Sequence, residues 1–204
     1  MFKSKLRRLS VFLALAVAAG SMMTDQTETQ ADEGASPLVT FETTHGSFAV
    51  ALEPDSAPKT VENFLAYVRT GHYDGTIFHR IIAGFMIQGG GYDERYQQLP
   101  TRAPIENEAP GAPGNDRGTI AMARTADPHS ATAQFFINVV DNDFLNHRGK
   151  NPQGWGYAAF GRVVDGMETV DRIAALQTGP GGPFPSDVPK EAVVIQQVTA
   201  GSGS

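Results

Sequence analysis

From Gly75 onward the sequence consists of short runs of apolar and β-branched residues that Gly, Pro and Asn interrupt. The runs are TIFHRII, FMIQ, GTIAMA, AQFFINV and YAAFGRVV. Short runs rich in Val, Ile, Phe and Thr between such residues are typical of β-strands. Five or more strands of this kind indicate an antiparallel sandwich or barrel.

Two further patterns precede these strands. The stretch VTFETTHGSFAVAL alternates apolar and polar residues on both sides of His45-Gly46, which predicts a β-hairpin. An amphipathic helix is predicted to follow, with Pro58 in its first turn and its end at Gly71. Its apolar positions recur at the helical spacing and are Val61, Phe64, Leu65 and Val68.

A second helix is predicted in DGMETVDRIAAL, with Gly179 as the residue that stops it. Its apolar stripe consists of Met167, Val170, Ile173 and Ala174. The run AVVIQQV is the expected last strand. The predicted architecture is a single, mostly antiparallel β-domain that closes into a barrel, with the two helices over its ends.

The first twenty residues, MFKSKLRRLSVFLALAVAAG, have a basic start and an apolar run that ends in small residues. This is the layout of a secretory signal peptide. The apolar run covers only about eleven residues, whereas a helix needs roughly 20 to cross a bilayer. We therefore expect export to the periplasm with cleavage, and membrane tethering at the N-terminus is the alternative.

The remaining chain divides into three parts. Residues 21–36 are polar and acidic, which is typical of a flexible tether. Residues 37–200 are expected to form the folded domain. Residues 201–204, GSGS, are expected to be a disordered tail.

The charge and the cysteine content exclude several classes of function. The formal net charge is −6, and loss of residues 1–20 would remove four positive charges and no negative ones, which leaves −10. Nucleic acid and anionic lipid are therefore poor candidate partners. The chain has no Cys, which excludes disulfides, a thiol nucleophile and thiolate zinc sites.

Other familiar site patterns are missing from the sequence. The glycines at 89–91 are not followed by the residues of a phosphate-binding loop, so a loop at a strand end is the better interpretation. The five His residues do not have metal-ligand spacing. Ser130 and the other Ser residues lack the context of an activated nucleophile, which leaves a hydrolase without support. We expect no metal and no cofactor.

Polar side chains within apolar strands are the remaining candidates for chemistry. Alternation places Met86 and Gln88 on one face of their strand, and it places Phe78, Arg80 and Ile82 on one face of theirs. Such a surface is typical of an apolar pocket with one directed cationic donor. The polar residues are Arg80, Gln88, Gln134 and Asn138, and the aromatic residues close to them are Phe85, Phe135, Phe136 and Phe144.

The segments FHRIIAGFMIQGG, GTIAMAR, SATAQFFINV, FLNH and YAAFGRVVDGM resemble the cyclophilin-type peptidyl-prolyl cis-trans isomerases in order and approximate spacing. The resemblance covers roughly residues 38 to 198 and is strongest to the exported bacterial branch. It implies an eight-stranded antiparallel closed β-barrel capped by two α-helices, in agreement with the patterns above.

The resemblance also implies roles for individual residues. Arg80 is similar to the family's catalytic arginine, and Gln88 and Ala123, with Arg124 beside them, match positions that contact the substrate backbone. The residues matched to the proline pocket are Phe85, Met86, Phe136 and Leu145. His79 and Gln134 are expected to support the site.

Two substrate-binding positions depart from the eukaryotic pattern of the family. Phe144 stands where that pattern has Trp, and Tyr157 stands where it has His. The implied partners are proline-containing polypeptides, and a monomer is expected. An exported binding module that holds such segments is the competing hypothesis, although a pure binder would not need Arg80.

Overall fold

The computed structural model describes residues 36–151 and 153–201. The expected signal peptide at residues 1–20 lies outside this part of the chain, as do residues 21–35 of the expected tether and residues 202–204. The helices of the described residues include none that is both long and apolar enough to cross a membrane.

The described residues form eleven strands, two α-helices and one 3-10 helix. In chain order they are β1 (Leu38–Thr43), β2 (Gly46–Leu52), α1 (Pro58–Arg69), β3 (Thr76–Ile77), β4 (Arg80–Ile82), β5 (Met86–Gly89), β6 (Thr119–Met122), β7 (Phe135–Asn138), η1 (Asp143–Leu145), β8 (Ala159–Asp165), α2 (Met167–Ala174), β9 (Thr178–Gly181), β10 (Phe184–Pro189) and β11 (Val194–Gly201).

Nine strands form one antiparallel sheet in the order β3-β11-β1-β2-β8-β6-β7-β5-β4, and β9 and β10 form a separate hairpin. The mostly β architecture with two helices is confirmed. The expectation of eight strands in a closed barrel is not met in detail, because the sheet has nine strands and β3 and β4 at its edges do not pair with each other. β3 and β4 are the two edges of the sheet, yet only Phe78 and His79 separate them in sequence. The sheet therefore curls until its edges meet, and the chain itself joins them without a hydrogen-bonded ladder.

The predicted hairpin is present as β1 and β2, in which Thr43 pairs with Gly46. Gly46 has a φ of +117°, a conformation that suits glycine, and Thr43 Oγ1 donates a 2.7 Å hydrogen bond to its carbonyl. On its other side, β1 pairs with β11, and Leu38 lies opposite Gly201. The last strand thus extends one residue past the expected end of the domain.

The two helices begin and end for different reasons. α1 starts with Pro58 and has Ala57 at its N-cap, so its free N–H groups are satisfied from a distant loop. The carboxylate of Glu108 accepts hydrogen bonds from the backbone N–H of Lys59 at 3.1 Å and of Thr60 at 2.8 Å. α2 ends at Ala174, and Gly179, which was expected to stop it, lies in β9 instead.

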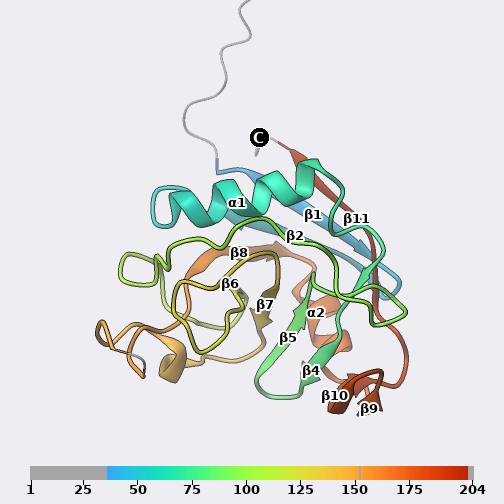
Figure 1. Cartoon of the computed structure of the whole chain (residues 1–204). Helices are drawn as coiled ribbons and strands as arrows, with labels where there is room; N and C mark the ends of the chain where they lie inside the picture. Colours follow the sequence, from blue (N-terminus) through green and yellow to red (C-terminus); the bar gives the residue numbers. More distant parts are fainter. Residues whose placement is uncertain (1–35, 152, 202–204) are drawn as a thin grey trace, which may run out of the picture. The chain divides into compact units, whose positions relative to one another are not determined.

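The main core lies between one face of the curled sheet and both helices, since it includes Phe64 of α1 and Ile173 of α2. The ring of Phe64 on α1 lies 5.1 Å from Phe160, 5.9 Å from Phe135 and 6.2 Å from Phe41, measured between centroids. Figure 1 shows α1 packed along β11, and the β9–β10 hairpin beside β4. A second, smaller apolar cluster forms elsewhere and consists of Met86, Ala121, Phe136, Leu145 and Ala159.

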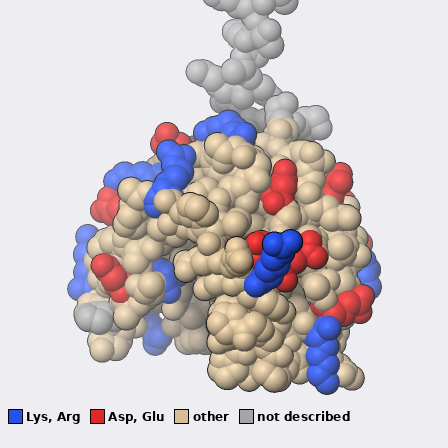
Figure 2. All heavy atoms as spheres, turned by 45° about the vertical axis from the view of Figure 1, so that its right-hand side comes forward, with Lys and Arg blue, Asp and Glu red and all other residues tan. Residues whose placement is uncertain are grey.

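The surface carries charges of both signs. On the face that Figure 2 turns forward, Lys and Arg side chains are interspersed with Asp and Glu side chains, and wide areas carry neither. A protein that binds nucleic acid through its phosphates gathers Lys and Arg on one face. This face shows no such gathering among the residues described.

Candidate active site

A pocket of about 120 Å³ opens over the smaller apolar cluster, on the sheet face opposite the main core. Alternation along the strands separates the two faces, because Ile87 and Ile137 belong to the main core while Met86 and Phe136 belong to the smaller cluster. The residues that line the pocket are Arg80, Phe85, Met86, Gln88, Ala123, Arg124, Phe136, Leu145 and Tyr157. All nine were singled out from the sequence.

The strand register brings the polar and apolar sides of the pocket together. Arg80 on β4 lies directly opposite Gln88 on β5, and Gln88 lies opposite Phe136 on β7. Side chains of directly opposed residues in an antiparallel pair project from the same face. Three neighbouring strands therefore place a guanidinium, an amide and a phenyl ring in one row.

Phe78 does not share the face of Arg80, and the expectation that it would is wrong. The chain leaves β3 at Ile77 and enters β4 at Arg80, so the period-two alternation is broken between them. Phe78 is fully buried, and its ring meets the edge of Phe135 at 5.9 Å in the main core. The run TIFHRII gives no sign in the sequence that two residues, Phe78 and His79, interrupt the strand.

A short chain of polar contacts orients the amide of the pocket. Gln88 accepts a long contact of 3.5 Å from Arg80 Nη1, and its own Nε2 donates a 3.0 Å hydrogen bond to Gln134 Oε1. Gln134 lies against Gly91, where an added Cβ would stand 2.5 Å from the Gln134 side chain. The third glycine of the Gly-rich stretch is thus needed to seat Gln134, and through it to orient Gln88.

Arg124 and Tyr157 form the opposite wall. The Arg124 guanidinium carbon lies 4.4 Å from the centre of the Tyr157 ring, and Arg124 Nε donates a 3.0 Å hydrogen bond to the carbonyl of Gly156. The Tyr157 ring meets Phe136 edge-on at 5.6 Å. The backbone of Ala123 is held by a 2.9 Å hydrogen bond from its N–H to the carbonyl of Gln134.

Phe144 is near the pocket but does not line it. Its side chain is 58% exposed and stacks on Phe85 with 5.6 Å between ring centroids. Leu145, the next residue of the 3-10 helix η1, is buried and contributes to the pocket wall. The helix thus directs one apolar residue into the pocket and one toward solvent beside it.

A network of buried asparagines behind the pocket was not predicted from the sequence. Asn115 Nδ2 donates to the carbonyls of Leu145 at 3.3 Å and Tyr157 at 3.1 Å. Asn142 Nδ2 donates to the carbonyl of Phe85 at 3.0 Å. Asn138, which the sequence grouped with the polar residues of the pocket, is fully buried and joins the other two asparagines.

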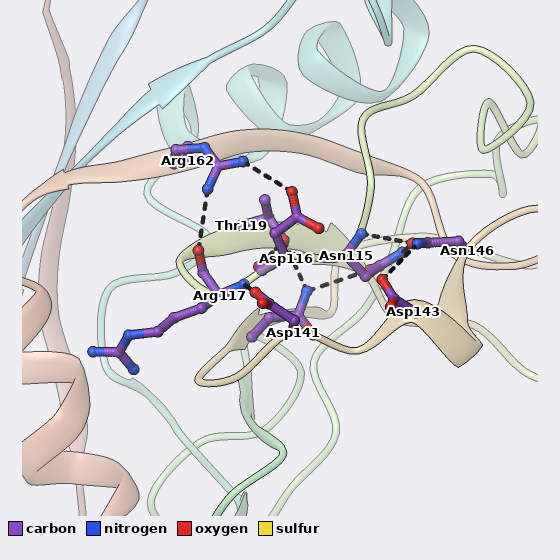
Figure 3. A network of polar contacts seen from close by, with 9 residues as sticks. Asn115, Asp116, Arg117, Thr119, Asp141, Asp143, Asn146 and Arg162 are labelled. Carbon is purple, nitrogen blue, oxygen red and sulfur yellow. Dashed lines mark hydrogen bonds and ion pairs between the residues drawn. The ribbon is translucent and has the colours of Figure 1, made fainter.

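This network fixes the backbone of three pocket residues. Figure 3 shows Asn115 hydrogen-bonded to Asn146, with the ion pair of Arg162 and Asp116 nearby. Every buried amide of this kind must be hydrogen-bonded, because an unsatisfied one costs several kcal/mol in order of magnitude. The polar network therefore maintains the shape of an apolar pocket.

His79 lies next to the pocket in sequence but faces away from it. Its imidazole is buried between Tyr92, at 4.7 Å, and Phe184, at 5.3 Å between ring centroids. Burial is the main cause that lowers the pKa of His79 to about 4, and the charge of Arg80 acts in the same direction. At neutral pH the ring is uncharged and adds no second cation beside Arg80.

The side chains of the types that could bind a metal ion lie apart from one another in the described residues. Within residues 36–151 and 153–201, no three His, Asp or Glu side chains come together in a group that could hold a metal ion. The pocket contains only neutral side chains and two guanidinium groups.

Comparison with known proteins identifies the family. Residues 38–200 match the family described as "Cyclophilin type peptidyl-prolyl cis-trans isomerase/CLD". The chain belongs to the cyclophilin-type peptidyl-prolyl cis-trans isomerases. The resemblance stated from the sequence motifs is thereby confirmed, and so is the enzyme class.

Individual relatives agree with this assignment. This cyclophilin is 58% identical over 162 residues to peptidyl-prolyl cis-trans isomerase B of Escherichia coli K12. The match covers 79% of this chain and 98% of that protein. It is 60% identical over 158 residues to an isomerase of Streptomyces antibioticus, at 78% and 95% coverage. The crystal structure of a Cryptosporidium parvum cyclophilin is similar with a TM-score of 0.65 and 27% identity, covering 83% of this chain and 99% of that one.

Substitution of Gly91 by Ala tests the seating of Gln134. The added methyl group displaces Gln134 and removes the partner of Gln88, so we expect kcat/KM for a prolyl peptide to fall about tenfold while the protein still folds. Gly111→Ala is the matched control, because the nearest atom to its new Cβ lies 3.6 Å away. Equal kcat/KM values for the two variants would contradict this role of Gly91.

The buried His79 predicts a loss of stability in mild acid. Below about pH 6.5 the unfolded chain binds a proton on this imidazole, which the folded protein accepts only near pH 4. Stability therefore falls as the pH drops from 6.5 to 4, by up to roughly 3 kcal/mol from this group. Urea unfolding at pH 7, 5.5 and 4.5 measures it, and His79→Phe should show a smaller fall than the parent. Parallel curves would refute the assignment.

Proposed function

We propose that this cyclophilin accelerates rotation about X-Pro bonds in exported polypeptides that are folding or unfolded, with Arg80 as its catalytic residue. The observation that carries the proposal is the position of Arg80 at the edge of an apolar pocket, opposite Gln88 in the register of β4 and β5. The isomerases of Escherichia coli and Streptomyces antibioticus are related closely enough to support the same reaction here.

The physical problem is the conjugation of the amide bond. An X-Pro bond interconverts in about 10 to 100 s, because rotation must break the overlap between nitrogen and carbonyl at a cost of roughly 20 kcal/mol. No bond is formed or cleaved, so the reaction needs no nucleophile. The enzyme has only to bind the twisted amide more tightly than either planar isomer.

Arg80 is suited to that selective binding. A guanidinium N–H that donates to the prolyl nitrogen finds an available lone pair only when the amide is twisted, since the lone pair of a planar amide is delocalised. The interaction thus strengthens as the transition state is approached. Arginine remains charged at any working pH, so this donor does not titrate away.

The apolar pocket and Gln88 hold the two sides of the bond that rotates. The proline ring would occupy the pocket between Phe85, Met86, Phe136 and Leu145. Gln88, kept in place by its hydrogen bond to Gln134, would hold the carbonyl side. Because the ring is held while the preceding carbonyl turns, the motion of the bound substrate is confined to rotation about the X-Pro bond.

Replacement of Arg80 by Ala tests the catalytic assignment. We expect kcat/KM to fall by about 10² to 10³, as for removal of a single transition-state donor in other enzymes. NMR exchange spectroscopy on an Ala-Pro-Phe peptide measures the rate without a coupled protease. Arg69→Ala, at the exposed end of α1, is the control and should retain the parent rate. Binding of the peptide without acceleration by the parent protein would instead indicate a holding module.

Export is the second part of the proposal and rests on residues 1–20. We expect the full chain, expressed in a Gram-negative bacterium, to be recovered by osmotic shock in a shortened form that mass spectrometry identifies. Leu13→Arg with Leu15→Arg should block this, because each charge in the apolar run opposes insertion by about 3 kcal/mol. Recovery of uncleaved chain from the cytoplasm would overturn export, and uncleaved chain in the inner membrane would favour tethering.

A further inference from the structure

We propose that Asp187, on the β9–β10 hairpin, positions the guanidinium of Arg80 for catalysis. The inference rests on the catalytic role proposed for Arg80. Asp187 does not line the pocket and is not a catalytic residue itself. Its sequence context gives no sign of such a role, since it lies in the Gly- and Pro-rich segment TGPGGPFPSDVP.

The contact between the two side chains leaves part of the guanidinium available to a substrate. Asp187 Oδ2 lies 3.6 Å from Arg80 Nε, at ion-pair distance. On the other side, Nη1 of Arg80 points to Gln88 Oε1 at 3.5 Å. An arginine has five N–H donors, so these two contacts restrain the plane of the group and leave further Nη donors unused.

An exposed ion pair of this length contributes little to folding stability. The side chain of Arg80 is 42% exposed and that of Asp187 is 34% exposed, and surface pairs are weakened by solvent and salt. The ion pair can still orient the guanidinium, because arginine has a long side chain with many rotamers that a nearby carboxylate restricts. A carboxylate that restricts the guanidinium before the substrate arrives reduces the ordering that the reaction would otherwise require.

The backbone of the hairpin is shaped to present Asp187. Phe184 pairs with Gly181 and Val188 pairs with Gly179, so three residues of β10 lie opposite the single residue Pro180 of β9. Bulges of this kind redirect side chains and are frequent beside active sites. Asp187 itself has a φ of +66°, a left-handed conformation that Asp and Asn tolerate better than most residues.

The base of the hairpin is anchored to the residue that precedes Arg80. The ring of Phe184 lies 5.3 Å from His79 and 5.1 Å from Tyr92. Val188 is buried against Gly181, where an added Cβ would stand 2.7 Å from its side chain. Figure 1 shows β10 beside β4, the strand that carries Arg80. The hairpin and the arginine are therefore fixed to each other at two points, Phe184 on His79 and Asp187 on Arg80.

Two substitutions separate charge from backbone effects. Asp187→Asn keeps the left-handed conformation and an acceptor oxygen but removes the charge, and Asp187→Gly keeps the conformation but removes the side chain. We expect kcat for the Ala-Pro-Phe peptide to fall about threefold in the first and about tenfold in the second, with KM unchanged within twofold. The control is Asp171→Asn, which breaks a shorter, 2.7 Å ion pair with Arg117 outside the pocket and should leave kcat unchanged.

A double substitution shows whether Asp187 acts through Arg80. In an Arg80→Ala background, Asp187→Gly should cause no further loss of the residual rate. The Arg80 Nε–H resonance should also shift in Asp187→Asn and stay unchanged in Asp171→Asn.

The outcomes distinguish this inference from the proposed function. Parent kcat in Asp187→Gly, alongside an inactive Arg80→Ala, overturns the positioning role and leaves the catalytic role of Arg80 intact. An equal further loss from Asp187→Gly in the Arg80→Ala background also overturns it, since the effect would then not pass through Arg80. Full activity of Arg80→Ala overturns the catalytic assignment, and the positioning role with it.

Discussion

The alternation of side chains across one curled sheet is the constraint on which the rest of this structure depends. Each central strand must supply apolar residues to both of its faces, because one face covers the main core under α1 and the other forms the floor of the pocket. Ile87 and Met86 illustrate the division, as do Ile137 and Phe136. A shift of one residue in the register of β5 would exchange the two sets, and would bury Gln88 while it exposed Ile87.

Polar groups stabilise the pocket from behind, while apolar groups form its interior. The amides of Asn115 and Asn142 hold the backbone of the pocket walls, Asn138 connects these two amides, and the amide of Gln134 holds Gln88. Each of the three asparagines has several hydrogen-bond partners, so the site gains rigidity without a charged group in its floor. Two cations line the pocket: Arg124 lies over the ring of Tyr157, and Arg80 stands at the edge with 42% of its side chain exposed.

The family resemblance, rather than a local pattern, assigned Ala123, Arg124, Leu145 and Tyr157 to the pocket. Local patterns in the sequence predicted the β-rich class, both helices, the first hairpin and the pocket residues Arg80, Met86, Gln88 and Phe136. They did so because apolar periodicity and strand parity are local properties. The break at Phe78 and His79, the capping of α1 by Glu108 and the approach of Asp187 to Arg80 depend on residues that are distant in sequence or on a bulge. Asn115 and Asn142 lie in loops, where nothing in the neighbouring residues distinguishes a buried amide from a solvated one.

The pairing of β11 with both β1 and β3 has a consequence for the timing of folding. The first strand of the domain can complete its ladder only with the last one, so a chain growing from its N-terminus cannot close the sheet until residues 194–201 have been made. Until then β1 has β2 as its only neighbour, and a two-stranded hairpin is marginal by itself. The sheet of the nascent domain therefore stays incomplete until its last strand has been synthesised.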